Sequence, residues 1–298
     1  MTHKLDADDF FIHSIQRHCA EAGLNFFLIE PLWVEMFYSQ LLRGAVWPRA
    51  LLNMHSEHHQ PQEVFHQLVR LAAEKGTKVI DPPDVALAAF DKSRVHARLV
   101  EAGLRVPFTV IVPGNQVAAF RLGDRERAAL GTPFVIKPAL GYGRRGVVTN
   151  ATSEHDLAKS AAAWPDGHYL LQRRIVPRQV NGWPMYFRVY FVFGTVWHSW
   201  WNCFTDNYRL VTPQEMADLA LPPLEDIIRR IAALTGMNFF SSEVAQTEAG
   251  EFVVIDYVND QCHMLSQSAN PKIGVPDALV AAIARRLVEA VRGMVRKA

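Results

Sequence analysis

Apolar residues come in short runs, separated by longer stretches of helical spacing, over the first ninety residues. The runs at residues 26–30, 49–54 and 77–80 are predicted strands, and each follows a predicted helix, at about 8–21, 32–42 and 61–75. The third helix has Pro61 near its start and Gly76 just past its end, which is typical of helix boundaries. Strands alternating with helices of this length predict a small parallel α/β lobe.

The pattern changes after a proline-containing break at residues 81–84, which predicts a boundary. Beyond it we expect strands at 106–112, 169–172, 239–246 and 252–257, and helices at 91–101, 153–163, 223–234 and 277–296. Two long apolar strands at 186–193 and 196–201 are predicted to form a hairpin that turns at Gly194 and Thr195. The chain is therefore expected to be an α/β (α+β) protein.

The composition argues against some classes of partner and compartment but identifies no specific partner. The 298 residues are 49% hydrophobic and 20% charged, with a net charge of +1, so no global field favours nucleic acid or a membrane surface. The charged N-terminus lacks an apolar signal core, and no run approaches the roughly 20 apolar residues of a membrane span. Three scattered cysteines fit a reducing compartment. We expect a cytoplasmic protein that binds neither nucleic acid nor membrane.

A glycine-rich turn between the strand-like segments 134–138 and 147–148 is the most informative local signal. Glycines let backbone N–H groups approach a ligand closely, and neighbouring cations add positive charge. The turn is neither a P-loop nor a Rossmann fingerprint, because no helix follows it. It predicts either a plain structural turn or a flap over a nucleotide polyphosphate, formed by Lys137, Gly141, Gly143, Arg144, Arg145 and Gly146.

Oxygen-bearing side chains gather near the ends of the last two predicted strands. Asp256 ends an apolar run, Asn259 follows it, and Glu243 lies on the preceding strand. Such oxygens suit Mg²⁺, although the two carboxylates could equally pair with arginines as structural ions. Arg188 lies within an apolar strand and needs an anionic partner, either a substrate phosphate or an internal carboxylate.

The order of these pieces resembles the ATP-grasp superfamily, which includes glutathione synthetase, D-alanine–D-alanine ligase, the ribosomal-protein glutamate ligase and tubulin tyrosine ligase. The resemblance covers about residues 80–298, and the segment in front looks like the pre-ATP-grasp domain of that family. It implies an ATP-grasp fold with an N-terminal parallel α/β pre-ATP-grasp lobe at 1–85. The ATP-grasp domain would span 86–298, with a central subdomain at about 86–175 and a C-terminal subdomain at about 176–298.

The resemblance also implies roles for single residues. Arg188 would be the catalytic residue that stabilises the transferring phosphoryl group. ATP would be bound by two lysines, the flap and a hinge whose backbone holds the adenine edge: Lys92, Lys137, Gly141, Gly143, Arg144, Arg145, Gly146, Gln172, Arg173, Arg174 and Ile175. One or two Mg²⁺ ions, with Mn²⁺ as a substitute, would be bound by Glu243, Asp256 and Asn259.

Three departures from the family pattern point to a divergent branch. Two residues, rather than one, separate Asp256 from Asn259, so either a bulge brings Asn259 round or Asp260 replaces it. The hinge contains two arginines where an acidic or aromatic residue is common. Tyr186 stands where an acidic residue usually precedes the phosphate arginine by two positions.

Weaker signals surround this set. The loop at 55–59 contains three histidines and is expected to be a polar loop rather than a metal site. His263 is weighed as a substrate contact against a structural role, and Arg209 as a possible phosphate contact. Trp197, Trp200 and Trp201 are expected in the core or at a lobe interface, with a substrate platform as the alternative.

The resemblance implies an ATP- and Mg²⁺-dependent carboxylate–amine ligase. It would form an amide from a small-molecule carboxylate and an amine, such as an amino acid or peptide, through an acylphosphate, with release of ADP and phosphate. The alternatives are an ATP-grasp small-molecule kinase and a non-catalytic nucleotide-binding module. Homo-oligomers are common among such ligases, and the sequence does not name the substrates.

Overall fold

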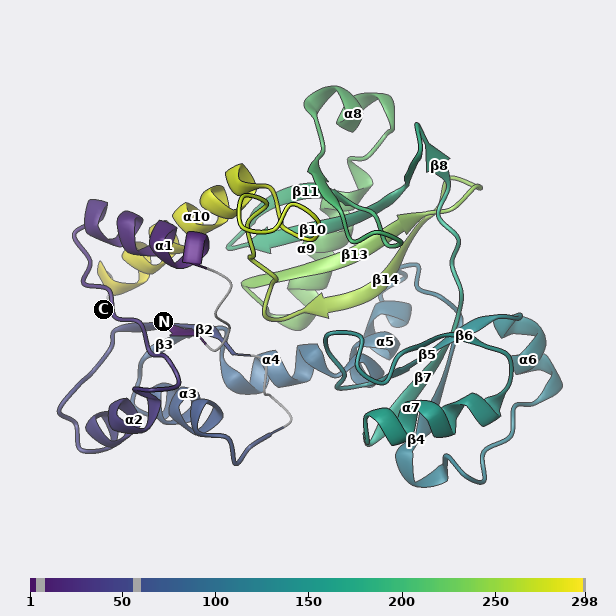
Figure 1. Ribbon diagram of the computed structural model, residues 1–298, viewed down its shortest axis with the longest axis horizontal. Coiled ribbons are helices and arrows are strands. Elements are labelled where there is room, and N and C mark those ends of the chain that lie inside the picture. Colours follow the sequence, from purple (N-terminus) through teal and green to yellow (C-terminus); the bar gives the residue numbers. More distant parts are fainter. Residues whose placement is uncertain (4–8, 56–59, 297–298) are drawn as a thin grey trace.

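The computed structural model describes residues 1–3, 9–55 and 60–296, and arranges them around three main sheets (Figure 1). The front lobe lies on one side in purple and blue, the central sheet in teal, and a larger sheet in green. Within these residues no helix is both long and apolar enough to cross a membrane.

The front lobe is a three-stranded parallel sheet in the order β1-β2-β3. Its strands are β1 (Thr2–His3), β2 (Ala50–Met54) and β3 (Lys78–Ile80), and its helices are α1 (Asp9–Glu21), α2 (Val34–Leu42) and α3 (Val64–Glu74). Apolar residues of α2 and α3 pack against β2, and α1 packs on the long C-terminal helix. The parallel α/β prediction for this lobe is confirmed.

The strand predicted at 26–30 is wrong as a strand. Among the described residues Ile29 makes a single isolated parallel bridge, to Thr2, and the rest of the segment is irregular. The outer strand is instead β1 at the N-terminus, where the backbone of Ile29 exchanges hydrogen bonds with Met1 and His3. A two-residue strand within a polar segment has too few positions to show the alternation that identifies strands.

The central sheet is antiparallel, in the order β4-β7-β5-β6. Its strands are β4 (Thr109–Pro113), β5 (Phe134–Pro138), β6 (Val148–Ala151) and β7 (His168–Arg173). Helices α4 (Pro83–Phe90) and α5 (Lys92–Glu101) precede it, and α6 (Asp124–Leu130) and α7 (Leu157–Ala163) pack on it together with 3-10 turns at Gly114–Gln116 and Glu154–Asp156. The sequence analysis did not identify α6, and it indicated β6 only through the strand-like segment 147–148.

The larger sheet has five antiparallel strands in the order β12-β11-β10-β13-β14. They are β10 (Tyr186–Val192), β11 (Thr195–Trp201), β12 (Tyr208–Leu210), β13 (Phe239–Gln246) and β14 (Phe252–Asn259). Helix α9 (Pro223–Thr235) packs on one face, and α10 (Asp277–Arg296) with α1 on the other. The small hairpin of β8 (Gln179–Val180) and β9 (Trp183–Pro184) and the helix α8 (Pro213–Asp218) were not predicted.

The hairpin between β10 and β11 turns one residue earlier than expected. Val192 pairs with Thr195, so the two loop residues are Phe193 and Gly194, with φ of 46° and 85°. Two positive φ values match the turn whose twist fits a tight hairpin. The sequence analysis placed the turn by the glycine alone, which can occupy either loop position.

Candidate nucleotide and metal site

Two lysines from different elements reach the same carboxylate. Asp91 caps α5 by accepting hydrogen bonds from the backbone of Ser93 and Arg94, which places Lys92 in the first turn. The Nζ atoms of Lys92 and Lys137 lie 3.8 Å and 3.7 Å from Asp256 Oδ1. Both lysine side chains are buried, so their charges are poorly solvated and favour a nearby anion.

Each lysine also donates to a backbone carbonyl. Lys92 Nζ donates to the carbonyl of Gly141 in the flap at 2.9 Å, and Lys137 Nζ donates to that of Ile255 in β14 at 2.9 Å. The Lys137 ammonium lies 5.3 Å from the centroid of the Tyr257 ring. The lysine of the central sheet is thereby tied to the edge strand of the larger sheet.

The third cation, Arg188, is paired across the larger sheet. In the register of β10 with β13, Arg188 lies opposite Glu243, and its guanidinium donates to Glu243 Oε1. The hydroxyl of Tyr186 donates to the other oxygen, Glu243 Oε2, at 2.9 Å. The guanidinium carbon lies 4.8 Å from the centroid of the Trp201 ring. Of the two partners left open for Arg188, the structure shows the internal carboxylate.

A bulge in the last hairpin decides the place of Asn259. Glu243 lies opposite Asp256 and Ser241 lies opposite Asn259, so three positions of β14 match two of β13. Since Ser241 and Glu243 are on one face of β13, the bulge brings Asn259 to the same face as Asp256. The bulge is one of the two explanations of the unusual spacing, the other being replacement of Asn259 by Asp260.

Burial is the largest influence on the charges of this cluster. It raises the pKa of Glu243 above its ordinary value, and the Arg188 charge offsets this only in part. Burial also favours a raised pKa for Asp256, but Lys92, Lys137 and Arg188 together outweigh it and bring that pKa below its ordinary value. Burial lowers the pKa of Lys137 despite the Asp256 charge. Asp256 is therefore the carboxylate that balances the two lysines.

The donor set suits a hard divalent cation that also binds phosphate oxygens. The described residues contain no group of three histidine, cysteine, aspartate or glutamate side chains able to hold a metal by themselves. They do place the carboxylates of Glu243 and Asp256 opposite each other. Asp256 Oδ1 is buried and has no hydrogen-bond partner among the described residues. Mg²⁺ typically takes one or two carboxylates and completes its shell with phosphates and water, so Glu243, Asp256 and Asn259 fit it.

The flap is folded down onto neighbouring elements. Gly143, Arg144 and Gly146 have φ of 58°, 59° and 72°. Arg144 pairs with Asp206 through both carboxylate oxygens, one contact measuring 3.2 Å. This ion pair joins the flap to the loop between β11 and β12.

The next flap residue, Arg145, faces aromatic rings. Its guanidinium carbon lies 5.2 Å from the centroid of the Tyr142 ring and 5.6 Å from that of Trp164. Of the two predicted flap arginines, only Arg144 contacts the larger sheet.

The hinge separates into residues that face β14 and residues that do not. Gln172 Nε2 donates to the Tyr257 hydroxyl at 2.7 Å, and Ile175 packs in the apolar cluster that includes Ile255. Arg173 donates to a carbonyl of α6, and Arg174 donates to Asn150 Oδ1 at 3.1 Å. Both arginines are thus directed toward the central sheet and its helices, and only their backbone remains as the predicted adenine contact.

Several weaker candidates lie outside this cluster. Arg209 packs between the rings of Trp183 and Trp200 and pairs with Glu215 at 2.7 Å, on the α8 and α9 side of the sheet, so it does not join the other cations. Trp200 is fully buried, as expected. The sequence analysis weighed Trp201 only as part of an aromatic patch, and it gave no site role to Tyr257, whose only signal was its place beside Asp256.

The histidine candidates have structural contacts. His55 Nε2 lies 3.1 Å from Glu63 Oε2 and its ring stacks on Phe65, while residues 56–59 of the same loop lie outside the described residues. The ring of His263 stacks on Tyr208, with centroids 6.5 Å apart. His55 also accepts at its carbonyl from Gln261, so the two loops meet.

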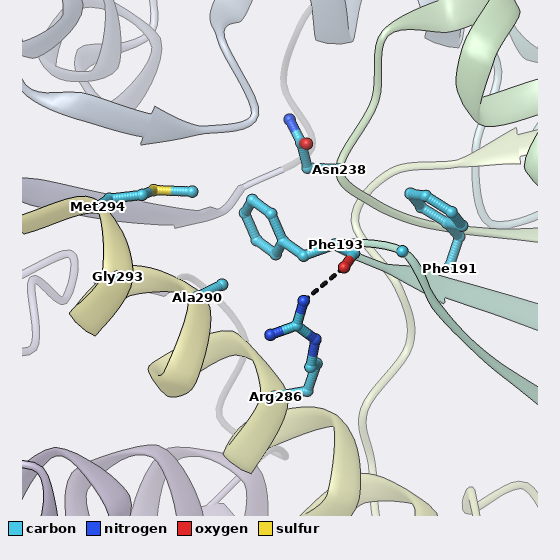
Figure 2. Close-up of a pocket in the computed structure, with 8 residues that line it drawn as sticks. Phe191, Phe193, Asn238, Arg286, Ala290, Gly293 and Met294 are labelled. Carbon is cyan, nitrogen blue, oxygen red and sulfur yellow. Dashed lines mark hydrogen bonds between the residues drawn. The ribbon is translucent and has the colours of Figure 1, made fainter. Parts of the chain in front are cut away.

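Two surface hollows are separate from the cation cluster. One, of about 460 Å³, lies between the β10–β11 turn and α10, where Figure 2 shows Arg286 donating to the Phe193 carbonyl. The other, of about 650 Å³, lies beside the hinge, with Phe108, Arg173 and Ile175 in its lining. Neither is lined by Lys92, Lys137, Arg188 or their carboxylate partners.

Comparison with known proteins identifies the fold. No protein-family model and no curated protein sequence matches the chain. Among solved structures, it is similar to the ATP-grasp ligase PsnB complexed with minimal precursor, Mg and ADP, at 16% identity and a TM-score of 0.62, over 99% of this chain and 98% of that one. A RimK-domain ATP-grasp protein from Sphaerobacter thermophilus DSM 20745 matches at 17% identity and 0.64, over 97% and 98%.

A third similar structure is the D-alanine–D-alanine ligase from Bacillus anthracis complexed with ATP. It matches at 13% identity with a TM-score of 0.66, over 98% of this chain and 96% of that chain. These likenesses extend over nearly the whole length of each chain, so they include the front lobe as well as the two larger sheets. The chain therefore has the fold of the ATP-grasp superfamily.

Proposed function

We propose that the protein is an ATP- and Mg²⁺-dependent carboxylate–amine ligase. One observation carries the proposal: three cations and two carboxylates from α5, β5, β10, β13 and β14 meet beside a glycine-rich flap in an ATP-grasp fold. They are Lys92, Lys137, Arg188, Glu243 and Asp256. Phosphoryl transfer depends mainly on positioning and on neutralising phosphate charge, which such a set can supply.

Each side chain then has a role that follows from its place. Lys92 and Lys137 bind phosphate oxygens, and Arg188 neutralises charge on the transferring phosphoryl group. Glu243 and Asp256, with Asn259 on the same face, would hold one or two Mg²⁺ ions. When bound, Mg²⁺ neutralises phosphate charge and orients the polyphosphate. The flap excludes water from the reacting groups.

The proposed reaction has two steps. A carboxylate oxygen of the first substrate attacks the γ-phosphorus of ATP, and the bond to ADP breaks to leave an acylphosphate. The amine nitrogen of the second substrate attacks the acyl carbon, the bond to phosphate breaks, and the amine loses a proton. No side chain is assigned as the base, because an amine that arrives neutral needs none.

Amino acids or peptides are the substrate class that the comparisons favour. PsnB has been solved with a precursor peptide, and the Bacillus anthracis protein is a D-alanine–D-alanine ligase. Both names describe ligases that act on amino-acid or peptide groups, and the similarity reaches them only at 13–16% identity. The division of this chain at residues 85 and 175 is part of the same proposal.

The test is release of ADP and phosphate from Mg²⁺-ATP in the presence of pooled amino acids, short peptides and small carboxylic acids. Mass spectrometry of the same mixtures searches for products. A product equal to two components minus water, with free phosphate, supports the ligase. A phosphorylated product without free phosphate would make the protein a kinase, and nucleotide binding without turnover by any pool would favour a binding module. Asp256→Ala should abolish turnover.

A further inference from the structure

The cations assigned to the nucleotide phosphates are already paired with carboxylates of the protein. Asp256 Oδ1 lies within 4 Å of both Lys92 Nζ and Lys137 Nζ, and Glu243 Oε1 accepts from Arg188. The carboxylates that engage them are the two assigned to Mg²⁺. The phosphate-binding and metal-binding halves of the site therefore neutralise each other, leaving one positive charge in excess within the set.

Because these ion pairs are buried, breaking them costs substantial free energy. All five side chains are at most 21% exposed, so none of the charges can exchange its partner for bulk water at little cost. Breaking a buried ion pair by removing one partner is strongly unfavourable, because the remaining charge stays buried without compensation. A ligand that binds only the cations, or only the carboxylates, leaves the opposite charges of the site buried without a partner.

We infer that Asp256 and Glu243 act as internal counter-ions of Lys92, Lys137 and Arg188, so that nucleotide and Mg²⁺ bind in an obligatory exchange. This inference rests on the proposed function. Phosphate oxygens would pair with the three cations, and the two carboxylates would hold Mg²⁺, so that each ligand would remove the penalty that the other would meet alone. Metal-free ATP would also face two carboxylates at close range.

The sign of the Mg²⁺ effect distinguishes this exchange from simple attraction. A site consisting only of the three cations would bind the more negative, metal-free nucleotide more tightly. An exchange site binds it more weakly. Coupling between two ligands commonly changes affinity by up to about 100-fold, and we expect an effect of that order here.

The experiment is isothermal titration calorimetry of the full chain with a non-hydrolysable ATP analogue, with excess EDTA and then with Mg²⁺, at constant ionic strength. We expect binding at least about 30-fold tighter with Mg²⁺. Equal or tighter binding in EDTA would overturn the inference while leaving nucleotide binding, and thus the proposed function, in place. No binding under either condition would overturn both.

A variant tests the counter-ion role directly. Asp256→Asn frees Lys92 and Lys137 from their carboxylate while it weakens the metal site. We expect the analogue to bind this variant about tenfold more tightly than the native chain in EDTA, and the Mg²⁺ enhancement to fall below about tenfold. If Asp256 only ligates metal, affinity in EDTA stays unchanged or falls, which would overturn the inference.

A matched control separates this effect from a general change in charge or folding. Glu154→Gln makes the same carboxylate-to-amide change at a buried residue paired with Arg127 at 3.2 Å, in the central sheet region and away from the cluster. It should leave both affinities within about twofold. Thermal unfolding of each variant shows whether it is folded, and the native-chain titration already decides the sign if Asp256→Asn does not fold.

Discussion

At the scale of one residue, Tyr186 stands where the resemblance to the ATP-grasp pattern leads us to expect an acidic side chain, and its hydroxyl donates to Glu243. Burial and the neighbouring Glu243 raise its pKa well above the ordinary value, so the hydroxyl keeps its proton and donates it. A carboxylate here would place a third negative charge beside Glu243 and Asp256. The neutral hydroxyl instead satisfies the Glu243 oxygen that Arg188 does not contact.

Tyr186→Phe should destabilise the protein by about 1–3 kcal/mol, because a buried carboxylate loses one of its donors. Tyr190→Phe is the matched control. Tyr190 lies four residues along the same strand, is fully buried, and its hydroxyl has no hydrogen-bond partner among the described residues. Urea unfolding should show little loss for this control. Equal losses for the two variants would contradict the assigned role of the Tyr186 hydroxyl.

Two flap glycines are predicted to differ in their tolerance of a side chain. A Cβ at Gly146 would lie 2.7 Å from Trp164 Cβ and 2.8 Å from Pro138 Cγ, whereas one at Gly143 meets nothing within 4 Å. Both have positive φ. Gly143→Ala should therefore cost about 1–2 kcal/mol from the backbone alone. Gly146→Ala should lower the free energy of unfolding by more than this, as measured by urea unfolding. It should also weaken binding of the Mg²⁺-loaded ATP analogue, as measured by calorimetry.

At the scale of elements, the flap and the β11–β12 loop are joined by the ion pair of Arg144 with Asp206. The two side chains are 58% and 35% exposed, so the pair should contribute less than about 1 kcal/mol to global stability. Its effect is local, since it joins the tip of the flap to one loop of the larger sheet. Asp206→Asn should therefore change the flap rather than the fold.

Trypsin is the appropriate probe because it cleaves after Arg144 and Arg145. Asp206→Asn should speed cleavage there severalfold with little change in urea unfolding. Glu225→Gln removes a comparably exposed partner of Arg229 on α9 and serves as the control. Cleavage of the Asp206 variant at the native rate would show that the ion pair does not hold the flap.

At the scale of the molecule, Asp81 joins the front lobe to the larger sheet. Its carboxylate, just after β3, accepts from the backbone N–H groups of Asn238 and Phe239 at 3.0 Å and 2.8 Å, at the start of β13. Burial raises its pKa from 3.8 to about 7, although these hydrogen bonds act in the other direction.

This pKa gives a pH dependence with a definite sign. The folded protein binds the Asp81 proton more tightly than the unfolded chain, so the resulting stability is fully present below about pH 4 and is lost as pH rises through about 7. Urea unfolding between pH 4 and 8 should show this decline, and Asp81→Asn should make it less steep. Parallel pH profiles for the two proteins would contradict the assignment.

The sequence by itself determined most of the regular elements and the order of the chemistry. Strand β13 and helix α10 begin and end where their apolar patterns predicted. In a long buried strand or an amphipathic helix, the hydrophobic pattern extends over many residues and is therefore easy to recognise. Lys137, Arg188 and Asp256 could be singled out because charges within apolar strands require partners. The ATP-grasp fold was predicted from the same ordered residues and is confirmed.

Only the tertiary structure decided which of these charges meet. The bulge that turns Asn259 to the face of Asp256 depends on pairing with β13, and the partner of Arg188 depends on the register of β10. The direction of Arg173 and the use of the N-terminus as β1 likewise depend on neighbours distant in sequence. Periodicity records which side of an element is buried. Register and ion pairing are set between elements, so a single segment contains too little information to specify them.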